Sequence, residues 1–109
     1  MKMLFQQGMV PVDGPVREEA EAIRDGLLGR FRHRVTDVEV RVDEEERTGF
    51  KRCEVAVRLG AGLSIIGRHR GRDLHRALYQ AFARAAAQVR RLGRKPRRGG
   101  APGGAQVVA

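Results

Sequence analysis

Cationic side chains recur near the C-terminal end of the sequence with a spacing that fits phosphate binding. On a helical wheel at about 100° per residue, one side carries Arg76, Arg84, Arg90, Arg91, Arg94 and Lys95. No acidic residue follows Asp73. An arginine presents a planar fork of N–H donors that matches phosphate oxygens. These positions, with Arg97 and Arg98 just beyond them, are the candidate nucleic-acid-binding residues.

The uneven distribution of charge favours the same chemistry. The net charge is +9 over 109 residues. Residues 1–46 carry 7 basic and 11 acidic side chains, whereas residues 47–109 carry 15 basic and 2 acidic ones. So strong an excess of one sign repels itself, and binding to a polyanion relieves that repulsion. A solvated surface is the simpler alternative, although such surfaces usually mix both signs. Anionic lipid is the rival polyanion.

The other reactive side chains form no catalytic or metal-binding pattern. The three histidines share no metal-ligand spacing with one another or with Cys53, the single cysteine. Cys53 alternates with inward-facing residues, which predicts a buried apolar group. Glu54 and Asp73 are the only carboxylates of the basic half, whereas a nuclease needs clustered carboxylates. We therefore expect no enzyme activity, no cofactor, no metal and no small-molecule substrate.

Two amphipathic helices are predicted to position these residues. Asp13 and Asp73 suit the N-caps of the two helices, and Pro96 ends the second. Residues 15–32 carry an apolar stripe at steps of three and four, made of Val16, Ala20, Ile23, Leu27 and Phe31. Residues 74–95 carry an apolar arc of about 140°, made of Leu74, Ala77, Leu78, Ala81, Phe82, Ala85, Val89 and Leu92.

Four strands are predicted beside the helices. Residues 2–7 alternate weakly, as an edge strand would, and residues 38–42 and 53–59 alternate apolar with polar side chains. Residues 63–68 form the fourth strand, in which the facing of Ile66 is left open. The resulting order, β-α-β-β-β-α, predicts an α+β two-layer sandwich, with two helices on one face of a four-stranded sheet. The domain should span residues 1–95, followed by a flexible tail of Gly, Pro and Arg over residues 96–109.

The sequence also bears on the cellular compartment. No apolar run approaches the roughly 20 residues that a membrane span needs, and the start of the chain has no apolar signal region. A single cysteine fits a reducing compartment. We therefore expect a cytoplasmic protein without a membrane partner.

Four segments carry a resemblance to a known family, in order and in spacing. They are the opening MKMLFQQG, the helix VREEAEAIRDGLLGRF running into TDVEVRVD, the strands CEVAVRLGAGLSIIG around a glycine turn, and DLHRALYQAFARAAAQVRRLGRK. From Met1 to about Lys95 the chain resembles the short type of the ribosome hibernation family, whose members are called hibernation-promoting factor, ribosome-associated inhibitor or protein Y. It departs from the family at Arg68, Arg70 and Arg72, where an acidic stretch is frequent, and at His75, where an aromatic residue is usual.

The resemblance implies a function in translation. It implies binding to the small ribosomal subunit and its rRNA, in the channel through which mRNA and tRNA pass, so that translation is inhibited and the idle ribosome is protected. The rRNA phosphates would be contacted by Arg84, Arg90, Arg91, Arg94 and Lys95. Alternatives remain a general structured-RNA binder or ribosomal protein without a hibernation role, an RNA-directed enzyme, and a membrane-surface protein. The last is disfavoured because the apolar face of the helix is needed for the sheet. The oligomeric state is left open, as is the choice between silencing single ribosomes and pairing them.

Overall fold

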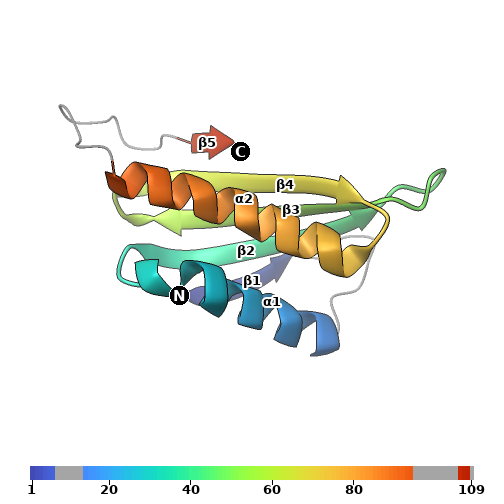
Figure 1. Ribbon diagram of the computed structural model, residues 1–109, viewed down its shortest axis with the longest axis horizontal. Helices are drawn as coiled ribbons and strands as arrows, with labels where there is room; N and C mark the ends of the chain where they lie inside the picture. The colour runs from blue at the N-terminus through green and yellow to red at the C-terminus, as the bar shows by residue number, and fades with distance from the viewer. Residues whose placement is uncertain (7–13, 95–105, 109) are drawn as a thin grey trace.

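Two helices cover one face of a mixed sheet in the computed structural model, which describes residues 1–6, 14–94 and 106–108 (Figure 1). The helices are α1 (Gly14–Leu28) and α2 (Leu74–Arg94), and the single-turn 3₁₀ helices are η1 (Gly29–Phe31) and η2 (Gly60–Gly62). The strands are β1 (Lys2–Gln6), β2 (Val35–Glu44), β3 (Lys51–Leu59), β4 (Ser64–Gly71) and β5 (Gln106–Val108). The predicted α+β sandwich, with the order β-α-β-β-β-α up to α2, is confirmed.

The sheet order follows the chain order, β1-β2-β3-β4-β5. β3 is antiparallel to both of its neighbours, whereas β1 pairs with β2 in parallel and β5 pairs with β4 in parallel. The register places Val40 opposite Val55 and Val57 opposite Ile65. Because paired residues point to the same side of a sheet, the valines of adjacent strands meet on one face.

The core lies between that face and the helices. Val38, Val40 and Val42 are fully buried, as are Val55 and Val57, which confirms the inward face predicted from the alternation. From α2 the core receives Ala77, Leu78, Ala81, Phe82, Ala85 and Val89. Most of the core residues contributed by helices come from α2, which packs on β3 and β4. The packing of α2 on these strands therefore determines which of its side chains face solvent.

Helix α1 is shorter than the predicted 15–32 segment. It ends at Leu28, after which η1 tightens the chain before β2 begins. Val16 and Ala20 of the predicted stripe are buried, while Ile23, Leu27 and Phe31 are partly buried against the core. The predicted cap Asp13 lies outside the described residues.

The sheet has one strand more than the sequence predicts. β5 continues the sheet beyond β4 by pairing with Ser64–Ile66, within the segment that was predicted as a tail without regular structure. Ile66 faces the side of the sheet away from the helices, where it is 8% exposed. Residues 95–105 lie outside the described part of the chain, so the domain end near residue 95 stays a prediction.

Candidate nucleic-acid interface

The predicted site residues lie along α2, whose start is fixed by Asp73. One carboxylate oxygen of Asp73 accepts hydrogen bonds from the His75 N–H at 2.9 Å and the Arg76 N–H at 3.4 Å, which confirms the predicted N-cap. Four of the predicted residues within the described part of α2 are exposed, namely Arg76, Arg84, Arg90 and Arg91. Arg94 closes the helix, and Lys95, Arg97 and Arg98 lie outside the described residues.

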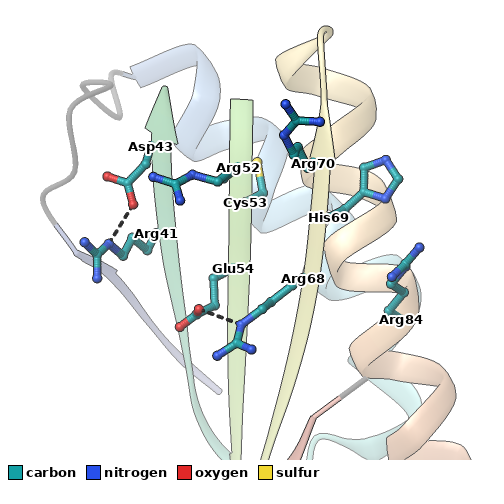
Figure 2. Close-up of a pocket in the computed structure, with 9 residues that line it drawn as sticks. All are labelled: Arg41, Asp43, Arg52, Cys53, Glu54, Arg68, His69, Arg70 and Arg84. Carbon is teal, nitrogen blue, oxygen red and sulfur yellow. Dashed lines mark hydrogen bonds and ion pairs between the residues drawn. The ribbon is translucent and has the colours of Figure 1, made fainter. Parts of the chain in front are cut away.

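The helix does not bring all of these arginines together. Arg76 lies in its first turn and Arg90 near its end, so about 21 Å of helix separates them at a rise of about 1.5 Å per residue. Arg84 lies between them on the side that faces β4, beside His69 (Figure 2). Only Arg90 and Arg91 therefore form a local pair among the exposed predicted residues.

The fold places Arg30, Arg32 and Arg34 at the end of the molecule that also holds Arg90 and Arg91. α2 runs antiparallel to β4, because Gly71 lies near Ala77 whereas Gly67 lies near Ala81 and Ala85. The last turn of α2 therefore lies over the start of β4, next to η2 (Figure 1). The start of β2 lies there as well, since the Gly60 N–H donates to the Arg34 carbonyl oxygen at 3.3 Å.

We call this the basic end, and define it by Arg30, Arg32, Arg34, Arg90 and Arg91. All five side chains are exposed. Among the residues that the structure describes, none of the five has an ion pair with a carboxylate. The Arg32 Nε instead donates to the Gly29 carbonyl oxygen at 3.2 Å. Sequence reasoning missed the first three, although the alternation Arg-Phe-Arg-His-Arg over residues 30–34 was a visible signal.

Arginines on the open face of the sheet, unlike those of the basic end, form ion pairs with carboxylates. Arg58 reaches Asp37 at 3.1 Å and Glu39 at 2.8 Å across the β2–β3 pair. Arg68 reaches Glu54 at 3.0 Å across the β3–β4 pair. The hydrogen bonds that Arg58 donates to Glu39 and to Asp37 raise the pKa of Arg58 above its usual range, with the Glu39 bond the larger cause. These cations are matched by carboxylates one strand away.

The same matching continues at the tip of the β2–β3 hairpin. The Arg70 guanidinium donates to Glu45 at 2.8 Å and stacks on the Phe50 ring with its central carbon 4.1 Å from the ring centroid. The Arg70 hydrogen bond is the largest influence on Glu45 and lowers the pKa of its carboxyl to about 2. Lys51 pairs with Glu44 beside it.

These pairs correct the charge argument made from the sequence. The acidic residues belong to the first half of the chain and the basic residues to the second, but β2 lies beside β3 and the two sets neutralise one another across the sheet. The repulsion expected within the basic half is therefore relieved inside the fold over much of the sheet. The unmatched positive charge is concentrated at the basic end and along the outer side of α2.

A hollow of about 640 Å³ lies against β2, β3 and β4 (Figure 2). Its arginines are mostly engaged, since Arg41 pairs with Asp43 at 2.9 Å and Arg68 with Glu54. Arg84 is its one lining arginine from a helix. The full lining is Arg41, Asp43, Arg52, Cys53, Glu54, Arg68, His69, Arg70 and Arg84.

The structure also places the residues considered for other chemistry. Cys53 is 2% exposed, and burial raises the pKa of its thiol to about 12, which disfavours the reactive thiolate. Within the described ranges, no three His, Cys, Asp or Glu side chains are grouped as a metal site would require. No helix in the described part of the chain is long and apolar enough to cross a membrane.

Two solved structures share the fold of this chain. A ribosomal subunit interface protein from Coxiella burnetii matches with a TM-score of 0.71 and 17% identity, covering 87% of this chain and 100% of that one. The N-terminal domain of Protein Y from Thermus thermophilus matches with a TM-score of 0.68 and 21% identity, covering 84% of this chain and 94% of that one. At these identities the likeness establishes the shared fold. No curated protein matches the sequence.

The sequence itself matches a family model over most of its length. The model, described as Sigma 54 modulation protein / S30EA ribosomal protein, covers residues 12–97, which include both helices, β2 to β4 and the basic end. The resemblance noted from the sequence motifs is therefore confirmed, and the chain belongs to the Sigma 54 modulation protein / S30EA ribosomal protein family, the family of the ribosome hibernation factors.

Proposed function

We propose that the protein binds the small ribosomal subunit through rRNA phosphates and thereby inhibits translation or stabilises idle ribosomes. The observation that carries this proposal is the basic end, where arginines from two segments about 60 residues apart in the chain lie at one end of the molecule without carboxylate partners among the described residues. Membership of a ribosome-associated family and likeness to a ribosomal subunit interface protein support the choice of the ribosome as the partner. The proposed setting is the cytoplasm, and the proposed role is binding without catalysis.

The proposed contact is made mainly by the basic end. Arg90 and Arg91 are retained from the sequence prediction, and Arg30, Arg32 and Arg34 join them. Arg84 and Arg76 extend the surface along α2, while Arg94, Lys95, Arg97 and Arg98 stay candidates that continue it past the last turn. If about six phosphates are engaged, the affinity for duplex-like RNA should fall with salt with a log–log slope near −5.

The test compares three double substitutions, each of which removes two positive charges. Arg90→Gln/Arg91→Gln and Arg30→Gln/Arg34→Gln each remove two cations from the basic end. Arg58→Gln/Arg68→Gln removes two cations from the sheet face, where both are paired with carboxylates. Each variant is sedimented with purified 30S subunits on sucrose gradients at moderate salt, and its thermal stability is measured separately.

Both basic-end variants should leave the small-subunit fraction while their melting temperatures stay near that of the wild type. The sheet-face variant should still co-sediment, because its cations are already neutralised within the fold. If all three variants lose binding equally, net charge alone drives it and the proposed site is wrong. If the wild type binds isolated structured RNA as tightly as it binds subunits, the general RNA-binding alternative replaces the ribosomal one.

A further inference from the structure

Tyr79 stands out on the outer side of α2. Its side chain is 46% exposed, and it is the exposed large hydrophobic residue of the described part of the chain. A single exposed apolar residue is common on protein surfaces and carries no meaning by itself. Its exposure is informative here because of the residues around the ring, and because no described cation or hydrogen-bond partner contacts it.

Two of the partly exposed aromatic rings, those of Phe5 and Phe50, are covered by cations. Arg17 lies over Phe5 at 4.6 Å from the ring centroid, and Arg70 and Arg72 lie over Phe50 at 4.1 and 5.2 Å. In the ranges described, no cation lies over Tyr79 and its hydroxyl has no hydrogen bond. Tyr79 therefore presents an aromatic face that the fold does not use.

Within one turn of Tyr79, α2 carries Arg76, Ala83, the buried Phe82 and His75, which pairs with Glu19 of α1. At about 100° per residue, Arg90 falls within about 20° of Tyr79 and Arg76 within about 60°. Both are exposed and without an ion pair among the described residues. Ala83, one turn after Tyr79, is too small to cover the ring. The exposed ring thus lies on the same side of the helix as Arg76, one turn before it, and Arg90, about 16 Å after it.

This combination indicates the chemistry of the partner. A purely apolar protein surface would leave Arg76 and Arg90 without compensation, whereas duplex RNA would satisfy the cations but offer no face to the ring. An RNA segment with an unpaired base offers both, because its phosphates carry negative charge and its base has an aromatic face. Stacking of bases on exposed aromatic side chains is a common mode of RNA recognition.

We propose that Tyr79 stacks on an unpaired nucleobase of the bound RNA, with Arg76 on an adjacent phosphate and Arg90, about 16 Å further along α2, on a phosphate of a more distant nucleotide. This inference rests on the proposed RNA-binding function and adds to it a preference for single-stranded or looped segments. Phosphate contacts alone would confer no such preference. The site is distinct from the basic end, although Arg90 belongs to both.

The composition of the chain allows a direct measurement. Tyr79 is the single tyrosine and the chain has no tryptophan, so its intrinsic tyrosine fluorescence reports on this ring alone. The probes are two RNAs of equal charge: a hairpin with an unpaired purine loop and a blunt duplex without unpaired bases. Binding is followed by tyrosine fluorescence and, independently, by the anisotropy of a dye on each RNA.

The hairpin should quench Tyr79 fluorescence strongly and the duplex should do so weakly. Tyr79→Ala and Tyr79→Leu should each weaken hairpin binding about 10-fold, while Tyr79→Phe keeps the wild-type affinity. Duplex affinity should be the same for all four proteins. Because Leu is apolar but has no aromatic face, its failure to rescue separates stacking from general hydrophobic contact.

Other outcomes distinguish this inference from the proposed function. If Arg90→Gln/Arg91→Gln weakens binding to both RNAs while Tyr79→Ala binds both normally, stacking is wrong and phosphate binding stands. If no variant or wild-type protein binds RNA or 30S subunits, the proposed function itself fails. If Tyr79→Leu keeps wild-type affinity, or if Tyr79→Ala instead abolishes self-association in sedimentation equilibrium, the ring is a protein contact and the stacking inference is overturned.

Discussion

Gly67 of β4 lies directly against the backbone of α2 at Ala81. A β carbon built on Gly67 would lie 2.2 Å from the Ala81 carbonyl oxygen and 2.7 Å from the Ala85 nitrogen. Both are main-chain atoms, which cannot rotate away as the end of a flexible side chain can. The absence of a side chain at residue 67 therefore allows α2 to pack closely on the sheet. This close packing also fixes the distance from β4 of the α2 residues Arg84, Arg90 and Arg91.

Replacing Gly67 with alanine should destabilise the fold. The added methyl group would force α2 away from β4, and overpacking of this kind typically costs about 1–3 kcal/mol, occasionally more. Urea denaturation should show the loss as a lower transition midpoint with an unchanged slope. A Gly67→Ala variant as stable as the wild type would mean that α2 does not approach β4 this closely.

Gly26 provides a control for the same substitution at a glycine that has open space around it. It lies inside α1, and a β carbon built on it meets nothing within 4 Å. Alanine is favoured over glycine in a helix interior by about 1 kcal/mol. We expect Gly26→Ala to raise the free energy of unfolding by up to about that amount, the opposite sign to Gly67→Ala in the same denaturation assay.

Much of the fold could be predicted because its signals are local. The alternation around Val38 and Val55 and the apolar arc of α2 are periodic patterns, and periodicity reports directly on which face is buried. β5 could not be predicted in this way, because a three-residue strand has no periodicity and forms only where β4 offers its edge. A Gly- and Pro-rich approach to that strand also favours irregular structure.

The candidate site was predictable only in part, since charge alone does not show which cations are neutralised. The sequence separates acidic from basic residues, but the hairpin brings Asp37 and Arg58 within 3.1 Å. The same topology places Arg34 beside η2 and so near the end of α2, although Arg34 and Arg90 are far apart in the chain. Both effects depend on strand order and register, which no run of residues displays.

Cys53 should be protected from alkylation in the folded protein. The side chain is 2% exposed and burial raises the pKa of its thiol to about 12, so almost no thiolate exists at pH 8. Labelling with iodoacetamide should therefore require opening of the sheet and should proceed far more slowly than in the urea-unfolded chain. Gly67→Ala should speed it, since a less stable fold opens more often. Labelling of the wild type at the unfolded rate would contradict the burial of this residue.

Glu45 should remain ionised well into the acid range. The Arg70 hydrogen bond, which outweighs the opposing effect of desolvation, lowers the carboxyl pKa from 4.5 to about 2. Because the folded pKa is the lower one, the contribution of this pair to stability is present above pH 4.5 and is lost as the pH falls through about 2. Carbon-detected NMR titration of the carboxyl groups should show this value, and Arg70→Gln should return it towards 4.5. An unshifted Glu45 in the wild type would contradict the pairing at the hairpin tip.

His75 should titrate above the usual range for histidine. Its Nδ1 lies in hydrogen-bond contact with Glu19 of α1, and this contact, followed by the charge of the same carboxylate, raises the imidazole pKa above 6.5. The folded state then holds the proton more tightly than the unfolded state, so the stabilising contribution is complete below pH 6.5 and is lost as the pH rises through the folded pKa.

Glu19→Gln should therefore destabilise the protein more at pH 5.5 than at pH 8.5, and should lower the His75 pKa in a proton NMR titration. His75→Gln is the control, because it removes the titrating group and should make the effect of Glu19→Gln independent of pH. A His75 pKa that does not respond to Glu19→Gln would show that the two helices are not joined at this point.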